Sequence, residues 1–172
     1  VFDGNNNTIS GLTINHNYGT DKISFIGEDG NAVNSYQNCA GLFGVVANGG
    51  IVKNLTVEGT LVEDMADPDG NWSYVGGVVA QVSGGVVENC TSKIAFSAGP
   101  NSSGKIRLGG VVGRVYASTA DVLVKNCKNE GAINISYAAG LEGQSIVGGV
   151  VAILADGSAG YTPTVSDCSN IA

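Results

Sequence analysis

The sequence has few charged residues, few prolines and a single histidine. Charged side chains make up 13% of its 172 residues, there are 3 prolines, and 15 acidic against 8 basic residues give a formal net charge of −7. A negative chain with scattered lysines and arginines repels phosphates, which disfavours a nucleic-acid partner. One histidine and no Cys-x-x-Cys pair argue against a structural zinc site. We therefore expect no cofactor and no nucleic-acid ligand.

The sequence also lacks a long apolar run. The longest, residues 146–155, contains two glycines and is far shorter than the roughly 20 residues of a membrane-spanning helix. We therefore expect no membrane insertion. The chain begins at Val1 without an initiator methionine and inside a repeat, so we expect it to be a fragment of a longer repeat protein.

Glycine, by contrast, is abundant, with 27 residues, and it marks an internal repeat. A Gly-rich block recurs at residues 40–44, 76–80, 109–113 and 148–152, with spacings of 36, 33 and 39 residues between equivalent glycines. A second block follows each copy, at residues 52–57, 87–92, 124–129 and 165–170, and residues 9–14 are assigned as an earlier copy. The pattern indicates one domain, residues 1–172, of about four and a half repeats. The repeat boundaries lie near residues 1–39, 40–75, 76–108, 109–147 and 148–172.

The apolar residues of each repeat are β-branched and alternate in short runs between Gly, Asn, Asp and Ser, which is typical of strands. Residues 94–97 and 132–136 suggest a third strand per repeat. One repeat cannot bury its apolar face alone, so stacking is the economical solution. We predict an all-β fold: a single-stranded parallel β-helix, or β-solenoid, right-handed, with loop excursions along one edge.

Stacking predicts columns of equivalent residues, one strand spacing apart. Two columns alternate in charge, as neighbouring strands should, and a third is made almost entirely of asparagine. These columns are Lys53, Glu88 and Lys125; Glu58, Lys93 and Glu130; and Asn54, Asn89, Asn126 and Asp167. Asparagine tolerates the left-handed backbone of a sharp bend, so the third column predicts a structural hydrogen-bonded ladder.

Four segments, residues 2–14, 40–44, 51–57 and 75–80, together resemble the GLUG-motif repeat family. Those repeats occur in large bacterial surface and secreted proteins, including adhesin-like proteins and the non-catalytic region of immunoglobulin A1 metalloproteases. The resemblance covers nearly the whole chain apart from the longer loops. It implies an extracellular or bacterial cell-surface β-solenoid that serves as a stalk, a display surface or a ligand-contacting module.

The four cysteines are expected to be unpaired core thiols. Cys90, Cys127 and Cys168 share one repeat position, to which Leu55 and Leu12 are assigned in the earlier copies. Leucine at equivalent places indicates an interior column, and parallel Cβ vectors give poor disulfide geometry. Cys39 is placed in the column of Val75, Leu108 and Val147, which also predicts a core position.

Candidates for metal binding and catalysis are weak. Asp67, Asp69 and Asn71 match alternate oxygen ligands of a calcium loop, but Trp72 stands where that loop needs glycine, so a solvated turn is favoured. Catalytic carboxylates would have to cluster on one face, whereas the strand glutamates alternate with lysine. Asp3 has no evident partner, and His16 is not placed near a serine and an acid.

The residues that interrupt the repeat are the better candidates for function. Insertions at residues 15–38, 62–74, 99–107 and 137–146 should emerge along one edge of the stack. The candidate ligand-binding residues at that edge are Tyr36, Trp72, Tyr74, Lys105, Arg107 and Tyr137. Such rings and cations suit a sugar or protein ligand. The alternative, slightly favoured for the aromatics, is that they fold back and cover the edge.

These observations favour a non-enzymatic module acting as a structural spacer or adhesin that contacts host glycans or proteins. Two alternatives stay open: a carbohydrate-active β-helix enzyme or its accessory domain, and the non-catalytic domain of a large secreted metalloprotease. The other expected partners are flanking repeats of the parent chain.

Overall fold

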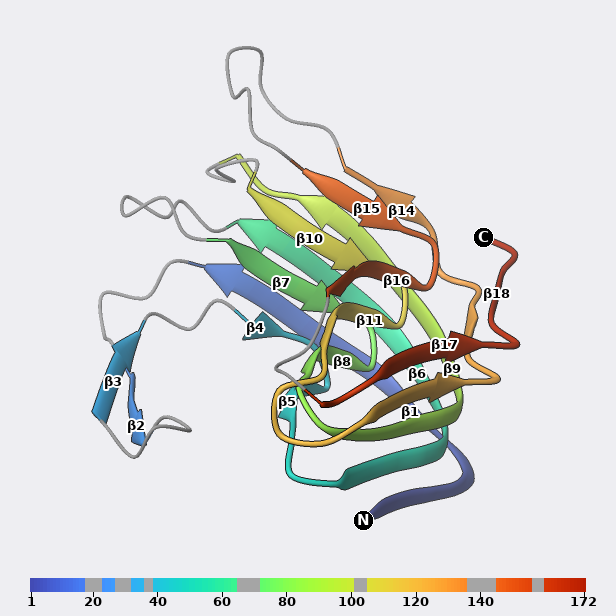
Figure 1. Cartoon of the computed structure of the whole chain (residues 1–172). Helices are drawn as coiled ribbons and strands as arrows, with labels where there is room; N and C mark the ends of the chain where they lie inside the picture. The colour runs from blue at the N-terminus through green and yellow to red at the C-terminus, as the bar shows by residue number, and fades with distance from the viewer. Residues whose placement is uncertain are drawn as a thin grey trace.

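The computed structural model describes residues 1–17, 23–26, 32–35, 39–64, 72–100, 105–135, 145–155 and 160–172. Within these ranges every regular element is a strand, and three parallel sheets stack into a β-solenoid (Figure 1). The predicted all-β parallel fold is confirmed. One antiparallel pair, β2 (Ile23–Ile26) with β3 (Ala32–Ser35), lies to the side of the stack.

Successive repeats contribute successive strands to each sheet. The first sheet follows the order β1 (Phe2–Asn17), β6 (Gly50–Asp64), β9 (Gly85–Ala98), β12 (Val122–Lys125) and β17 (Pro163–Ser166). Short strands β13 (Lys128–Asn129), β14 (Ile133–Asn134) and β18 (Ser169–Asn170) join it. The second sheet holds β4 (Cys39–Ala40), β7 (Ser73–Gly76), β10 (Ile106–Gly109) and β15 (Ile146–Gly148). The third holds β5 (Phe43–Val46), β8 (Val79–Val82), β11 (Val112–Tyr116) and β16 (Val151–Ala155).

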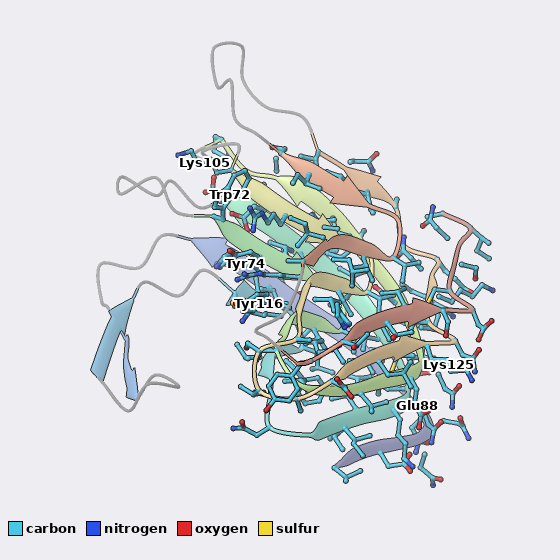
Figure 2. The ribbon with its side chains drawn as sticks, viewed as in Figure 1. Trp72, Tyr74, Glu88, Lys105, Tyr116 and Lys125 are labelled. Atoms are coloured by element: carbon cyan, nitrogen blue, oxygen red, sulfur yellow. The ribbon has the colours of Figure 1, made fainter. Side chains whose placement is uncertain are left out.

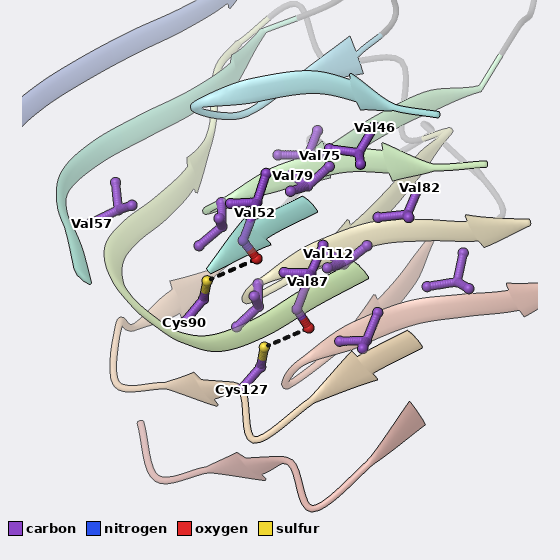
Figure 3. Close-up of a cluster of buried hydrophobic side chains, with 14 of the residues drawn as sticks. Val46, Val52, Val57, Val75, Val79, Val82, Val87, Cys90, Val112 and Cys127 are labelled. Atoms are coloured by element: carbon purple, nitrogen blue, oxygen red, sulfur yellow. Dashed lines mark hydrogen bonds between the residues drawn. The ribbon is translucent and has the colours of Figure 1, made fainter. Parts of the chain in front are cut away.

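The repeat register inferred from the Gly-rich blocks is confirmed. Leu108 pairs with Val75 below it and with Val147 above it. Val112 pairs in the same way with Val79 and Val151. The interior is filled with side chains from all three sheets, most of them valines (Figure 3). The expected third strand is present as well: it continues β9 without a break, and its Phe96 pairs with Ile133 of β14.

The asparagine column forms the predicted ladder. Asn54, Asn89, Asn126 and Asp167 all have left-handed backbones, with φ of 54°, 53°, 51° and 55°. Asn126 Nδ2 donates to Asn89 Oδ1 at 3.2 Å, and Asn89 Nδ2 donates to Asn54 Oδ1 at 3.0 Å. Asn54 Nδ2 in turn donates to the carboxylate of Asp3 at 3.0 Å. Every donor in the ladder therefore points toward the N-terminal end of the stack.

Close packing explains the small residues of the Gly-rich block. A side chain at Gly77 or Gly110 would overlap Ser92 or Asn129, which are fully buried on the far wall of the coil. A Cβ at Gly113 would lie 2.6 Å from Val75 O and 2.7 Å from Ala80 O. The block is therefore small because the second and third sheets meet there without room for a side chain.

All four thiols are free, as predicted. Cys90 and Cys127 are buried, and Cys39 and Cys168 are half-buried. Cys127 Sγ donates to Val87 O at 3.5 Å, and Cys90 Sγ lies 3.9 Å from Val52 O (Figure 3). Cys90 also pairs with Leu55, so that part of the predicted column is correct.

Two assignments at the N-terminal end were wrong. Phe2 and Asp3 pair with Val52 and Lys53, so residues 9–14 are not the earlier copy of that block, and Leu12 pairs with Gly59 instead of lying under Leu55. The cause is a pair of register shifts, between Asp3 and Asn7 and between Ile9 and Leu12, that lengthen β1. Asp3 does have partners, because it also lies 3.6 Å from Lys53 Nζ.

Two further assignments shift by small amounts. Cys39 pairs with Tyr74, and its neighbour Ala40 pairs with Val75, so Cys39 was placed one residue out of register. Because side chains alternate along a strand, that shift turns Cys39 away from the core column. All four insertions were also drawn too wide. Residues 15–17 and 62–64 belong to β1 and β6, where they pair with one another, and residues 73–74, 106–107 and 146 belong to β7, β10 and β15.

Candidate functional site

The candidate site lies where the long strands of the first sheet end and those of the second begin. β6 and β9 end at the same edge from which β7 and β10 start (Figure 1). Trp72, Tyr74 and Lys105 are found along this edge in Figure 2. The structure brings Trp72, Tyr74 and Arg107 together there, while Lys105 pairs through its backbone carbonyl with the amide of Ser73 at 2.9 Å. Tyr36, Tyr137 and the calcium candidates Asp67, Asp69 and Asn71 lie outside the described residues.

Two arginines alternate with three aromatic rings at this edge. The Arg107 guanidinium lies 4.2 Å from the Trp72 ring centroid and 5.5 Å from that of Tyr74. The Arg114 guanidinium lies 5.1 Å from the Tyr74 centroid and 4.5 Å from that of Tyr116. We call these five residues the Arg–aromatic cluster. Each cation–π contact stabilises a protein by about 0.5–1 kcal/mol at an exposed site, so together they hold both arginines in place.

Register explains how the cluster forms. Tyr74 and Arg107 are direct neighbours on β7 and β10, and Arg114 is the neighbour of Gln81 on β11 and β8. The corner between the second and third sheets brings these two pairs together. Arg107 Nη1 and Arg114 Nη1 both donate to the Tyr74 hydroxyl at 3.4 Å, and Arg114 Nη1 lies 3.4 Å from Gln81 Oε1.

The arginine side chains are incompletely hydrogen-bonded. The Nε atoms of Arg107 and Arg114 are buried without an acceptor. Cys39, which pairs with Tyr74, lies near the same positive charge. Burial raises the pKa of the Cys39 thiol to about 11, and Arg114 opposes that rise only in part. The cluster is therefore a cationic surface beside a protonated thiol.

Sequence reasoning missed Arg114, Tyr116 and Gln81. All three are half-buried, and they occupy alternate positions of β8 and β11 that face away from the core. The alternation of Arg114 and Tyr116 with the apolar Val115 and Ala117 would have identified the outward pair. It would not have shown that this pair lies next to Tyr74.

A second cluster, of three buried polar side chains, lies at the same edge. His16 Nδ1 lies 2.5 Å from Glu63 Oε2 and 3.3 Å from Ser73 Oγ. Glu63 is 0% exposed, so a charged or strongly hydrogen-bonded pair is held in the interior. The expectation that His16 is remote from any serine and acid was therefore wrong. Both partners lie on the same ring nitrogen, however, whereas a catalytic triad uses the two nitrogens separately.

Both charge columns on the outer face have the predicted register, and among the described residues the column of Glu58, Lys93 and Glu130 forms ion pairs. Lys93 Nζ lies 3.0 Å from Glu58 Oε1 and 3.9 Å from Glu130 Oε2, and Lys128 Nζ lies 2.6 Å from Glu130 Oε1. The hydrogen bond from Lys128 lowers the pKa of Glu130 below its ordinary value, and the charge of Lys93 acts in the same direction. Glu88 lies between Lys53 and Lys125 in register, and Figure 2 shows it beside Lys125, away from Trp72 and Tyr74.

Within the described ranges, no three histidine, cysteine or acidic side chains come close enough to hold a metal ion. The same ranges contain no helix of the length and apolar character needed to span a membrane.

Residues 73–96 match the family model of the GLUG motif. The match begins with β7, includes β8 and ends within β9, so it covers one strand of each sheet and the Gly-Gly corner between them. The chain thus carries a GLUG motif, as the resemblance indicated, and the motif corresponds to one structural repeat. No curated protein and no solved structure matches the chain.

Proposed function

We propose that this chain is a non-enzymatic β-solenoid module of a bacterial cell-surface or secreted protein, a rigid spacer whose loop edge binds host glycans or proteins. The observation that carries the proposal is the Arg–aromatic cluster. Its rings and guanidinium groups are fixed to one another at the edge where the repeat is interrupted. Aromatic rings beside cationic and amide groups provide the stacking and hydrogen bonds that sugar and protein ligands use.

The spacer role is supported by how each repeat is attached to the next. Parallel strand pairs join neighbouring repeats on three sheets, and the asparagine ladder adds side-chain hydrogen bonds at the bend. Because neighbouring repeats pair on all three sheets, bending one repeat against the next would break several ladders together. Such a stack holds its edge in a fixed orientation.

The proposal of a non-enzymatic role is supported by three strand carboxylates that already pair with basic side chains of the chain. Glu58 and Glu130 both lie within ion-pair distance of Lys93, and Glu63 is buried against His16. A carbohydrate-active enzyme, the alternative from the sequence, would use two carboxylates facing a substrate. The non-catalytic region of a secreted metalloprotease would present the same edge and is compatible with the proposal.

The test is an array of glycans and host extracellular proteins, probed with the chain and with a W72A/Y74A double variant. We expect a restricted set of ligands to bind the unchanged chain, and binding to fall at least about tenfold in the variant. Y161A is the matched control, because Tyr161 is a 44% exposed aromatic residue outside the cluster. Circular dichroism of each variant establishes that the stack is intact. Undiminished binding by the double variant, or no ligand on the array, would contradict the proposal.

A further inference from the structure

We infer that the ligand of the Arg–aromatic cluster is an acidic glycan, whose carboxylate binds Arg107 and Arg114. The inference rests on the proposed function, because it names the ligand class of the same site. Both guanidinium groups reach the Tyr74 hydroxyl, so two positive charges converge at one place on a chain whose net charge is −7.

Among the residues that the structure describes, no acidic side chain pairs with the two arginines of the cluster. Within the described ranges, the ion pairs involve His16, Lys53, Lys93 and Lys128, and none of them includes Arg107 or Arg114. Two neighbouring guanidinium groups repel each other, and the rings that flank them compensate only weakly. An anion between or beside them would remove this repulsion, so the cluster is prepared for a negative ligand.

The unused donors point to the same ligand. Nη1 of each arginine is engaged by neutral oxygens at 3.4 Å, and both Nε atoms are buried without an acceptor. Among the described residues the Nη2 atoms have no hydrogen-bond partner, and they are not among the buried unpaired atoms, so they are open to a ligand. A carboxylate oxygen at Nη2 would make a charge-assisted hydrogen bond, which is about twice as strong as a neutral one. The Tyr74 hydroxyl, which accepts from both arginines, still has its own proton to donate.

The aromatic residues favour a sugar over an acidic peptide. Trp72 and Tyr116 stand at the two ends of the cluster, and each stacks with one arginine. The C–H faces of a pyranose ring pack on such rings, while a neighbouring carboxylate reaches the guanidinium. The amide of Gln81, already aligned by Arg114, suits a sugar hydroxyl. An aspartate-rich peptide would bind the two arginines but would make no use of the aromatic rings.

The experiment measures binding of the 172-residue chain by isothermal titration calorimetry to oligogalacturonate, hyaluronan oligosaccharide and sialyllactose. Each is compared with its carboxyl methyl ester, which keeps the sugar rings and removes the charge. Dextran sulfate and poly-glutamate are the controls, because they supply sulfate and peptide anions without a sugar carboxylate. The variants are R107Q and R114Q, with K125Q as the control, because K125Q removes one positive charge from a column away from the cluster.

We expect at least one acid-form glycan to bind, and both esterification and each arginine variant to weaken it at least about tenfold, with K125Q unchanged. Equal binding of acid and ester, or binding on the array of neutral glycans only, would overturn the inference and leave the proposed function standing. Tighter binding of dextran sulfate would overturn the choice of a carboxylate, and tighter binding of poly-glutamate would overturn the choice of a glycan. If no glycan or protein binds in either experiment, both proposals fail. The ester comparison needs no variant, so it decides the matter even if R107Q or R114Q does not fold.

Discussion

At the scale of single residues, burial and a hydrogen bond between neighbouring thiols set the pKa values of the cysteines. The hydrogen bond between Cys90 and Cys127 lowers the pKa of Cys90 and, together with burial, raises that of Cys127. Burial also raises the pKa of Cys168 and takes that of Cys39 to about 11. Since the thiolate is the reactive form, roughly one Cys39 in ten thousand is ready to react at pH 7.

We therefore predict that a disulfide-exchange reagent modifies the folded chain far more slowly at pH 7 than the chain unfolded in guanidinium, where all four thiols become accessible. The measurement is the time course of thiol release followed by absorbance. Rapid modification of Cys90 or Cys127, the two buried thiols, in the folded chain would show that the interior column is open to solvent.

The buried acid Glu63 should contribute far more to stability than an exposed one. Replacing Glu63 with Gln removes the negative partner of His16 in a site where Glu63 is 0% exposed, and breaking a buried pair costs about 3–5 kcal/mol. The matched control is E58Q, whose ion pair with Lys93 is at the surface, where solvent screens the charges and the loss should be much smaller. Urea unfolding of both variants measures the difference. Equal losses of unfolding free energy in E63Q and E58Q would mean that the buried pair of His16 and Glu63 contributes no more than a surface pair.

The pKa of Asp3 lies below its ordinary value because three neighbouring donors, one of them the last amide of the ladder, stabilise its carboxylate. The amide N–H of Asn5 lowers the pKa of Asp3 most, followed by the side-chain amide of Asn54 and by Lys53. A lowered pKa in the folded state means that the stabilisation exists above the ordinary aspartate range and disappears as the pH falls through the folded value. We predict that N54A raises the pKa of Asp3, as measured by NMR titration, whereas N126A, two rungs away, leaves it unchanged. If the pKa of Asp3 is unchanged in N54A, the ladder does not stabilise the Asp3 carboxylate.

At the scale of elements, the tight corner between the second and third sheets makes equivalent glycines unequal. A Cβ at Gly113 would lie 2.6 Å from Val75 O, whereas a Cβ at Gly44, the same position of an earlier repeat, would meet nothing within 4 Å. We predict that G113A lowers the free energy of unfolding by about 1–3 kcal/mol, because the backbone must shift. G44A should be neutral or stabilise by about 0.4–1 kcal/mol, because alanine restricts the unfolded chain. Thermal unfolding of G113A and G44A measures both changes, and an equal loss of stability in the two variants would refute the packing explanation.

The pairing of elements could be predicted wherever the repeat is regular. The charge columns, the asparagine ladder and the stacked Gly-Gly corners all follow from the alignment of the repeats. That alignment was enough to place Lys93 against Glu58 and Asn89 over Asn54. The register of β1 could not be counted, because Asn5 and Asn6 both take left-handed backbones, with φ of 51° and 60°, inside an irregular stretch of strand.

The sites depend on contacts that no period encodes. His16 and Ser73 are 57 positions apart, and they meet because insertions of unequal length return to the same edge. Arg114 reaches Tyr74 around a corner whose angle depends on the packing of Gly113 and Ala80, not on any local pattern. The sequence alone therefore identified Trp72, Tyr74 and Arg107 as neighbours of the edge but missed the second half of the cluster.

At the scale of the whole molecule, both ends of the stack expose strand edges and apolar side chains. Val147, Leu154 and Ile171 are 47%, 52% and 62% exposed in the last repeat, and Val45 is 54% exposed in the first full repeat. Unpaired parallel edges are templates for further strand pairing. We predict that the isolated chain self-associates as its concentration rises, and that fusing a polar capping repeat to each end prevents it. Light scattering over a concentration series makes the measurement, and a chain that stays monomeric throughout would contradict the prediction.

The one-way orientation of the amides gives the stack an electrical polarity. Three side-chain dipoles add head to tail, with the positive end facing the carboxylate of Asp3 and the negative end facing the last rung, Asp167. Like an α-helix, the column should favour an anion at one end and a donor at the other. Asp167 occupies the end of the column where a donor would be favourable, but its carboxylate cannot donate. An asparagine from a further repeat could donate its side-chain amide to Asp167 and so start a new column with the same direction.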